Sequence, residues 1–179
     1  MSKNFEQISI FILLYLIGGF SYILLEMIWR GHSPWSMFLA GGLCFTLLTF
    51  LNHYMVNQQK KRSPALFSVS SRVKKFFVQQ IFWLGRCLCG GLLITSIEFF
   101  TGAIVNLWLG WHVWDYSSHH FQFLGQISLL YFILWTFLSA PVFWLGTCLQ
   151  KKLSLILHFF FRISLTPRLI HEKMPPKIS

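Results

Sequence analysis

Long continuous runs of apolar residues dominate the chain, and short polar segments separate them. Four such runs cover residues 8–29, 35–56, 81–109 and 124–149. Each reaches the roughly 20 residues that an α-helix needs to cross a hydrocarbon core of about 30 Å. A transmembrane β-barrel would instead show segments of about ten residues in which apolar and polar positions alternate. The pattern therefore predicts an all-α fold, a polytopic transmembrane bundle of four spanning helices.

Composition supports this prediction and narrows the function. Hydrophobic residues make up 55% of the chain and charged residues 11%, whereas charged residues are about a quarter of an average soluble protein. The formal net charge of +10 would suit a nucleic-acid-binding protein if the basic residues shared one soluble surface. They lie instead at the ends of the apolar runs, so we expect no nucleic acid as a partner.

The positions of the basic residues predict the topology. Lys151 and Lys152 follow the fourth run, a basic group lies between the second and third runs, and the other two connections hold only Arg30. Because cytoplasmic loops carry an excess of Lys and Arg, we expect both termini inside the cell and residues 31–34 and 110–123 outside. Anionic headgroups on the cytoplasmic side are expected to contact the central basic group: Lys60, Lys61, Arg62, Arg72, Lys74 and Lys75.

Three further segments complete the predicted organisation. Residues 57–75 are polar and contain Pro64, the composition of a cytoplasmic loop. Residues 153–163 are apolar but about half as long as a span, which favours an interfacial helix at the end of a transmembrane domain covering residues 1–164. Residues 165–179 contain prolines and scattered basic residues, and we expect a flexible cytoplasmic tail there.

Two glutamates inside the apolar runs need an explanation. Placing a carboxylate in a span costs roughly 2.5–3.5 kcal/mol, so Glu26 and Glu98 must face protein or water. The helical spacing of four places Arg30 beside Glu26 and Asn106 on the face of Glu98. Both faces also carry glycines that allow close helix packing: Gly18, Gly91, Gly102 and Gly110. Either the carboxylates are hydrogen-bonded or protonated within packing seams, or they line a polar cavity that opens to the outside.

The expected outer segment between the third and fourth runs gathers aromatic, acidic and imidazole side chains. Trp114 and Tyr116 suit a membrane interface, while Asp115 is of the kind that organises a turn. Histidines accompany them, but their spacing matches no metal motif, so no metal is predicted. The candidate residues for a substrate or ion pocket are Glu26, Arg30, Glu98, Asn106, Trp114, Asp115 and Tyr116.

Motifs of familiar enzymes do not occur in the chain. It has no G-x-x-x-x-G-K-[ST] loop, no G-x-S-x-G elbow and no H-E-x-x-H sequence. We therefore predict no catalytic residues and no cofactor. An intramembrane enzyme that acts on lipid headgroups, with Glu98 or Asp115 as general acid or base, is left as a minor alternative.

Three stretches resemble the ABC-transporter type IV permease-like family of membrane proteins. They are residues 26–45, residues 98–106, and the segment that begins with Trp-Asp-Tyr-Ser at 114–117 and continues to Ile127. The chain departs from the family at Gln126, where many members carry arginine. The resemblance implies a permease-like subunit that crosses the bacterial cytoplasmic membrane several times.

Four spans are few for a transporter that works alone. We therefore expect a homo-oligomer or a partner that carries the ATPase. The alternative is a structural or regulatory membrane protein whose polar faces bind a partner helix or whose basic segment binds anionic lipid.

Overall fold

The computed structural model describes residues 3–66 and 72–172. Its main elements are four long helices, and a short π-helix with a two-stranded antiparallel hairpin lies between the third and fourth. In chain order they are α1 (Lys3–Arg30), α2 (Trp35–Leu66), α3 (Arg72–Gly102), η1 (Ala103–Trp108), β1 (Gln122–Phe123), β2 (Ile127–Ser128) and α4 (Leu129–Glu172).

Each long helix carries an apolar stretch of membrane-spanning length. Within the described residues these stretches cover 4–28, 35–61, 73–108 and 129–160. Their length and composition confirm the prediction of an all-α transmembrane protein with four spans.

The structure corrects two predicted boundaries. Residues 57–66 are the end of α2 rather than part of a loop, since Gln and Lys favour a helix and Pro64 comes only in its last turns. The fourth helix begins at Leu129 rather than at residue 124, because residues 122–128 form the hairpin.

Beyond the fourth span, α4 continues without a break to Glu172. The structure therefore has no separate interfacial helix over residues 153–163, and residues 165–172 are helical. The remainder of the predicted tail, residues 173–179, lies outside the described residues, as do residues 67–71 of the predicted basic loop.

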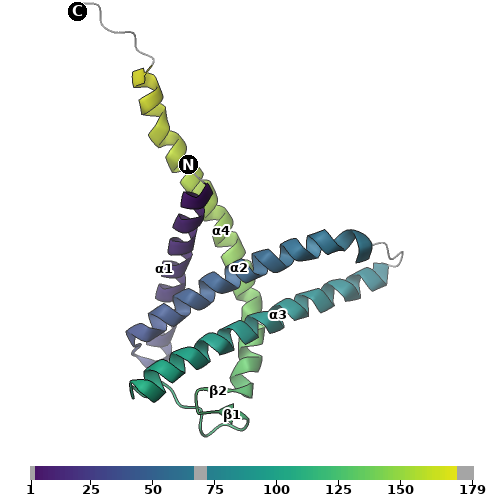
Figure 1. The fold of residues 1–179 in the computed structure, drawn as a ribbon, viewed down its shortest axis with the longest axis vertical. Coiled ribbons are helices and arrows are strands. Elements are labelled where there is room, and N and C mark those ends of the chain that lie inside the picture. Colours follow the sequence, from purple (N-terminus) through teal and green to yellow (C-terminus); the bar gives the residue numbers. More distant parts are fainter. Residues whose placement is uncertain (1–2, 67–71, 173–179) are drawn as a thin grey trace, which may run out of the picture.

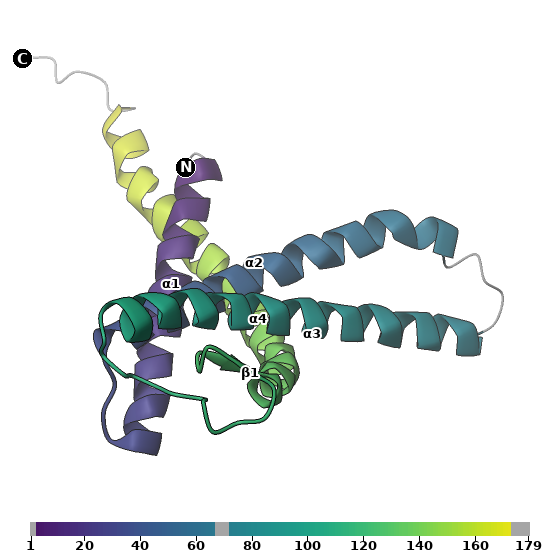
Figure 2. The same cartoon turned by 60° about the horizontal axis from the view of Figure 1, so that its bottom comes forward.

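The four helices come together at one end of the molecule and form two pairs toward the other, where α1 lies beside α4 and α2 beside α3 (Figure 1). In this arrangement α1 packs mainly against α2, and α3 packs mainly against α4. The connections 31–34 and 109–128 lie together at the end where the helices meet, which we call the loop end (Figures 1 and 2). From there the α2–α3 hairpin diverges from α1 and α4.

Small residues bring the helices close together. A Cβ atom at Gly18 would collide with Phe45 of α2, and one at Gly91 would collide with Thr136 of α4. Glycine at these positions lets two helix backbones approach closely, as is typical of helix packing in membranes.

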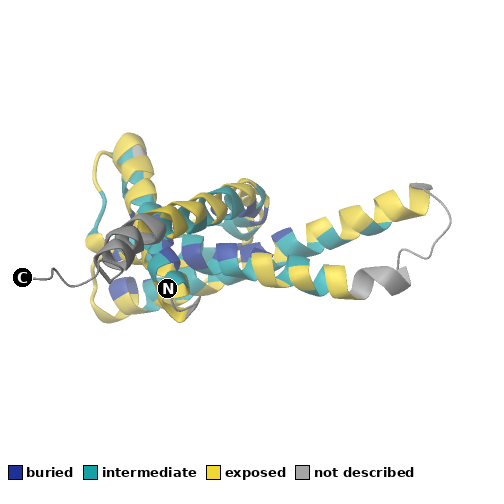
Figure 3. Ribbon diagram, turned by 90° about the horizontal axis from the view of Figure 1, so that it is seen from above, coloured by how far each residue is buried: buried dark blue, intermediate teal, exposed yellow. Residues whose placement is uncertain are grey.

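The buried core lies where α2, α3 and α4 cross. Its centre consists of Leu48, Cys87 and Phe143, one from each of these helices. Figure 3 shows buried residues concentrated at this crossing and exposed residues along the outer part of the α2–α3 hairpin.

Candidate functional site

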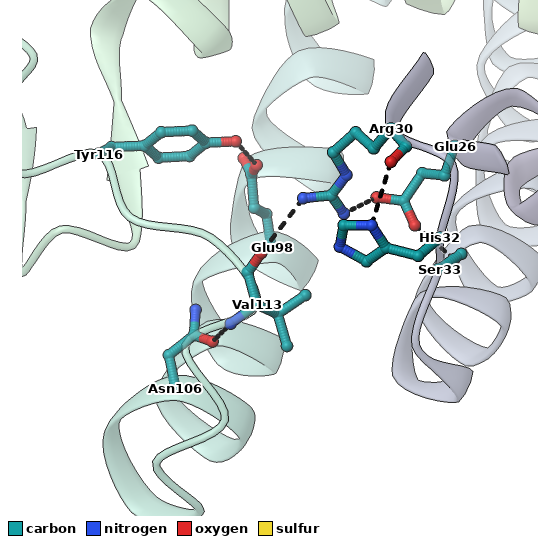
Figure 4. Close-up of polar contacts among 8 residues, drawn as sticks. All are labelled: Glu26, Arg30, His32, Ser33, Glu98, Asn106, Val113 and Tyr116. Carbon is teal, nitrogen blue, oxygen red and sulfur yellow. Dashed lines mark hydrogen bonds and ion pairs between the residues drawn. The ribbon is translucent and has the colours of Figure 1, made fainter. Parts of the chain in front are cut away.

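Glu98, near the end of α3, is the centre of a polar cluster at the loop end. Its Oε1 accepts a hydrogen bond of 2.8 Å from the Tyr116 hydroxyl, and its Oε2 accepts one of 2.9 Å from Trp135 Nε1. These donors come from the loop after η1 and from α4. The carboxylate therefore joins three parts of the chain, and both of its oxygens have a partner. Figure 4 shows the bond to Tyr116.

Aromatic packing holds Tyr116 in place beside Glu98. Its ring stacks on Tyr131 with 4.3 Å between the ring centroids, and His119 meets both rings edge-on. Burial raises the pKa of Tyr116, and the neighbouring charge of Glu98 raises it further. The hydroxyl therefore keeps its proton near neutral pH and remains a hydrogen-bond donor.

A second carboxylate lies at the end of α1. Glu26 accepts hydrogen bonds from the Arg30 guanidinium on one oxygen and from the Ser33 hydroxyl on the other. Arg30 also donates from Nη1 to the carbonyl oxygen of Val113 at 3.2 Å. This bond connects the first pair of helices to the loop that follows η1, as Figure 4 shows.

Asn106, in η1, organises the same loop from inside. Its side chain is buried, with Nδ2 donating to Trp114 O at 3.0 Å and to Gln126 Oε1 at 2.8 Å. Its Oδ1 accepts a 2.7 Å hydrogen bond from the amide of Val113. The amide group thus fixes both the start of the loop and the residue just before β2.

Gln126 completes this buried network. Its Nε2 donates to Leu124 O at 3.0 Å, and its backbone oxygen accepts a 3.1 Å bond from Trp114 Nε1. A Cβ atom at Gly102 would lie 2.5 Å from Gln126 Oε1. The absence of a side chain at Gly102 is what makes room for the glutamine.

Asp115 does not join the buried network. Its side chain is exposed, and its Oδ1 accepts hydrogen bonds from the Ser117 hydroxyl at 2.5 Å and the Ser117 amide at 2.8 Å. These bonds hold the pKa of Asp115 below its ordinary value. Any stabilisation from this turn is therefore present above the ordinary pKa and is lost as the pH falls through the lowered one.

The structure also places the remaining predicted site residues. Gly110 has a φ of +68° and open space around its Cβ position, so the turn after η1 explains this glycine and helix packing does not. Lys60, Lys61, Lys74 and Lys75 are exposed on the α2–α3 hairpin, whereas the side chains of Arg62 and Arg72 lie outside the described residues.

The sequence analysis did not predict four residues of the polar cluster as site residues: Ser33, Gln126, Tyr131 and Trp135. Trp135 and Tyr131 look like ordinary aromatic residues of a span, and only the fold brings them to Glu98. Gln126 gave a usable signal, since a polar side chain beside an apolar run needs a hydrogen-bond partner.

Among the residues that the structure describes, no three His, Cys, Asp or Glu side chains gather as metal ligands.

Four apolar helices of spanning length define a multi-pass membrane protein, with a buried polar network at one end. A family model described as "Putative ABC-transporter type IV" matches residues 65–167, which is more than half of the chain. The chain belongs to this family. Comparisons with curated proteins and with solved structures give no match.

Proposed function

We propose that the chain is a permease-like subunit of an ABC-type transport assembly in the bacterial cytoplasmic membrane, and that the loop end is its closed outer gate. The observation behind this proposal is the contrast between the two ends. At the loop end a hydrogen bond from Arg30 joins α1 to the loop after η1, and Glu98 joins that loop to α3 and α4. At the other end the α2–α3 hairpin diverges from α1 and α4 (Figure 1). A transport subunit that is closed on one side and open on the other would have this shape.

The basic residues favour an orientation with the loop end outside. Lys60, Lys61, Lys74 and Lys75 lie on the part of the hairpin far from the loop end. By the positive-inside rule this part faces the cytoplasm. The open side of the subunit would then face the side on which ATP is hydrolysed.

The polar cluster has the strength that a gate requires. The Arg30 bond to Val113 and the bonds to Glu98 involve charged partners, and each such bond contributes about 1.5–3 kcal/mol. Opening would break a few of these bonds without unfolding a helix. Since the chain carries no phosphate-binding loop, the energy would come from an ATPase partner, and a second copy of the chain is the natural candidate to complete a pathway.

Cys44 of α2 provides a test that needs no substrate. It is half-buried and lies within electrostatic range of Glu98. In a background with the other cysteines replaced by serine, we would add a membrane-impermeant maleimide to the outer side of cells or oriented vesicles. We expect slow labelling of Cys44 and an increase of about tenfold in Arg30→Ala and in Glu98→Ala, since each removes about 1.4 kcal/mol or more of closure.

Asp115→Asn is the matched control, because Asp115 is bonded to its own turn and its replacement should leave the labelling rate unchanged. Rapid labelling of Cys44 in the unmodified gate would contradict the proposal. The proposal would also be contradicted if neither Arg30→Ala nor Glu98→Ala changed the labelling rate of Cys44.

A structural or regulatory role is the second candidate. It is favoured by the fact that both oxygens of Glu26 and of Glu98 have partners within the chain, which a packing seam requires as much as a closed gate does. An unchanged labelling rate in both variants would select this role.

A further inference from the structure

A cleft between α2 and α3 lies away from the polar cluster and has no part in the proposed gate. Its volume is about 520 Å³, which is within the range of ligand pockets. Apolar side chains form much of its lining, among them Met55, Ile81 and Phe82. The polar side chains are those of Gln58, Gln59 and Arg86.

Arg86 is a cation without an acidic partner in this cleft. Its Nη1 donates to Asn52 Oδ1 at 3.2 Å, and its Nε is enclosed with no hydrogen-bond acceptor among the described residues. Among the described residues, the ion pairs join Glu26 to Arg30 and Glu6 to His158, and neither includes Arg86. A charge without a counter-charge is costly in a largely apolar cleft, so the cleft favours an anionic occupant that meets the accessible part of the guanidinium.

Nearby acidic residues do not supply that charge. The sequence of α2 contains no Asp or Glu, and the acidic residue of α3 is Glu98, twelve positions beyond Arg86. Twelve helical residues correspond to about 18 Å. On the other side of Arg86, near the start of α3, Lys74 and Lys75 add positive charge.

The position of the cleft along α3 places it at the level of the lipid headgroups. Arg86 lies 20 residues before Asn106 of the loop end, a separation of about 30 Å along a helix and close to the thickness of the hydrocarbon core. If the loop end lies at one membrane interface, Arg86 reaches the opposite one. There a guanidinium meets the phosphates of the lipids.

We propose that this cleft is a binding site for one anionic phospholipid, whose phosphate pairs with Arg86, whose headgroup lies beside Gln58 and Gln59, and whose acyl chains run from there toward the loop end, into the hydrocarbon core. The planar guanidinium presents paired N–H donors that fit phosphate oxygens. The acyl chains add apolar contacts in the hydrocarbon core that a free phosphate ion lacks, so the site prefers a lipid. The site is independent of the gate and of the transport role.

Native mass spectrometry of the full chain in detergent, titrated with dioleoyl phosphatidylglycerol, tests this site. We expect one lipid to bind more tightly than the rest. Arg86→Gln should weaken that first binding step about tenfold, because it removes a charge-assisted hydrogen bond. The affinity of Arg86→Lys for the first lipid should lie between those of the unmodified protein and of Arg86→Gln. Lysine keeps the charge but cannot present the paired N–H donors of the guanidinium.

Gly85→Leu separates binding from folding. A Cβ atom at Gly85 would meet nothing within 4 Å, so a leucine would occupy the cleft while Arg86 keeps its bond to Asn52. We expect this variant to melt at the same temperature as the unmodified protein or slightly above it, and to lose the tightly bound lipid.

The matched control is the double substitution of Lys74→Gln and Lys75→Gln, which removes more charge but lies outside the cleft. Its effect should stay below about twofold, as expected of exposed, solvated charges. The proposal is overturned if Arg86→Gln and Gly85→Leu bind the first lipid normally. It is overturned equally if millimolar inorganic phosphate displaces the lipid, since the ligand is then a free anion.

Discussion

Two buried asparagines mark the contrast between the loop end and the cleft. Asn106 makes three hydrogen bonds to groups that the chain itself supplies, Gln126 among them. Asn52 bonds Arg86 and Thr147, yet the Nε of Arg86 has no acceptor among the described residues. The loop end is thus closed by the chain alone, whereas the cleft provides positive charge that a further molecule has to balance.

Replacing each asparagine should reveal this difference most strongly. Asn106→Ala leaves Val113 N, Trp114 O and Gln126 Oε1 without a partner inside the protein, and we expect it to lower the free energy of unfolding by about 3 kcal/mol. Asn52→Ala should cost about 1 kcal/mol, since Arg86 is only half-buried and can turn to a headgroup or water. Titration of both variants with denaturing detergent in mixed micelles provides the measurement. Equal decreases in the free energy of unfolding would contradict the proposed difference between the loop end and the cleft.

Two glycines of α3 provide a smaller and better-matched comparison. A Cβ atom at Gly102 would lie 2.5 Å from Gln126 Oε1 and 3.0 Å from the Trp114 ring, so Gly102→Ala should cost about 2 kcal/mol by overpacking. Gly85→Ala meets no atom within 4 Å and should stabilise the helix by about 0.5 kcal/mol through lower backbone entropy in the unfolded chain.

The same detergent titration measures both alanine variants. A neutral Gly102→Ala would contradict tight packing of Gly102 against Gln126 and Trp114 at the loop end. A destabilising Gly85→Ala would show that the cleft is closed.

The sequence was sufficient to predict the four membrane-spanning helices but not the residues at which they begin and end. Apolar runs of spanning length predicted the four helices, because length and hydrophobicity alone decide which segments enter a bilayer. The end of α2 over residues 57–66 was missed because a polar segment with Pro64 also suits a loop. The start of α4 was misplaced because Leu124 and Ile127 extend the apolar pattern of the fourth run. Positive φ values at Leu124 and Gly125 prevent a helix there.

For the polar cluster, the cost of burying charge was the useful signal. It singled out Glu26 and Glu98 as residues that need partners, and helical spacing added Asn106. The structure supplies a partner to each. Sequence reasoning could not supply the identity of those partners. Trp135 lies 37 residues from Glu98 along the chain, and only the packing of α3 against α4 brings the two side chains together.

A double-mutant cycle between Glu98→Ala and Tyr116→Phe tests most directly whether the loop end is closed by the chain itself. Tyr116→Phe removes one hydroxyl and keeps the stacked ring, so the cycle isolates the hydrogen bond to Glu98 Oε1. We expect Tyr116→Phe to lower the free energy of unfolding in the native background and to have little effect beside Glu98→Ala, a coupling of about 1 kcal/mol or more. Additive losses, with a coupling below about 0.3 kcal/mol, would contradict a self-satisfied polar cluster and leave Glu98 free to serve a bound ligand.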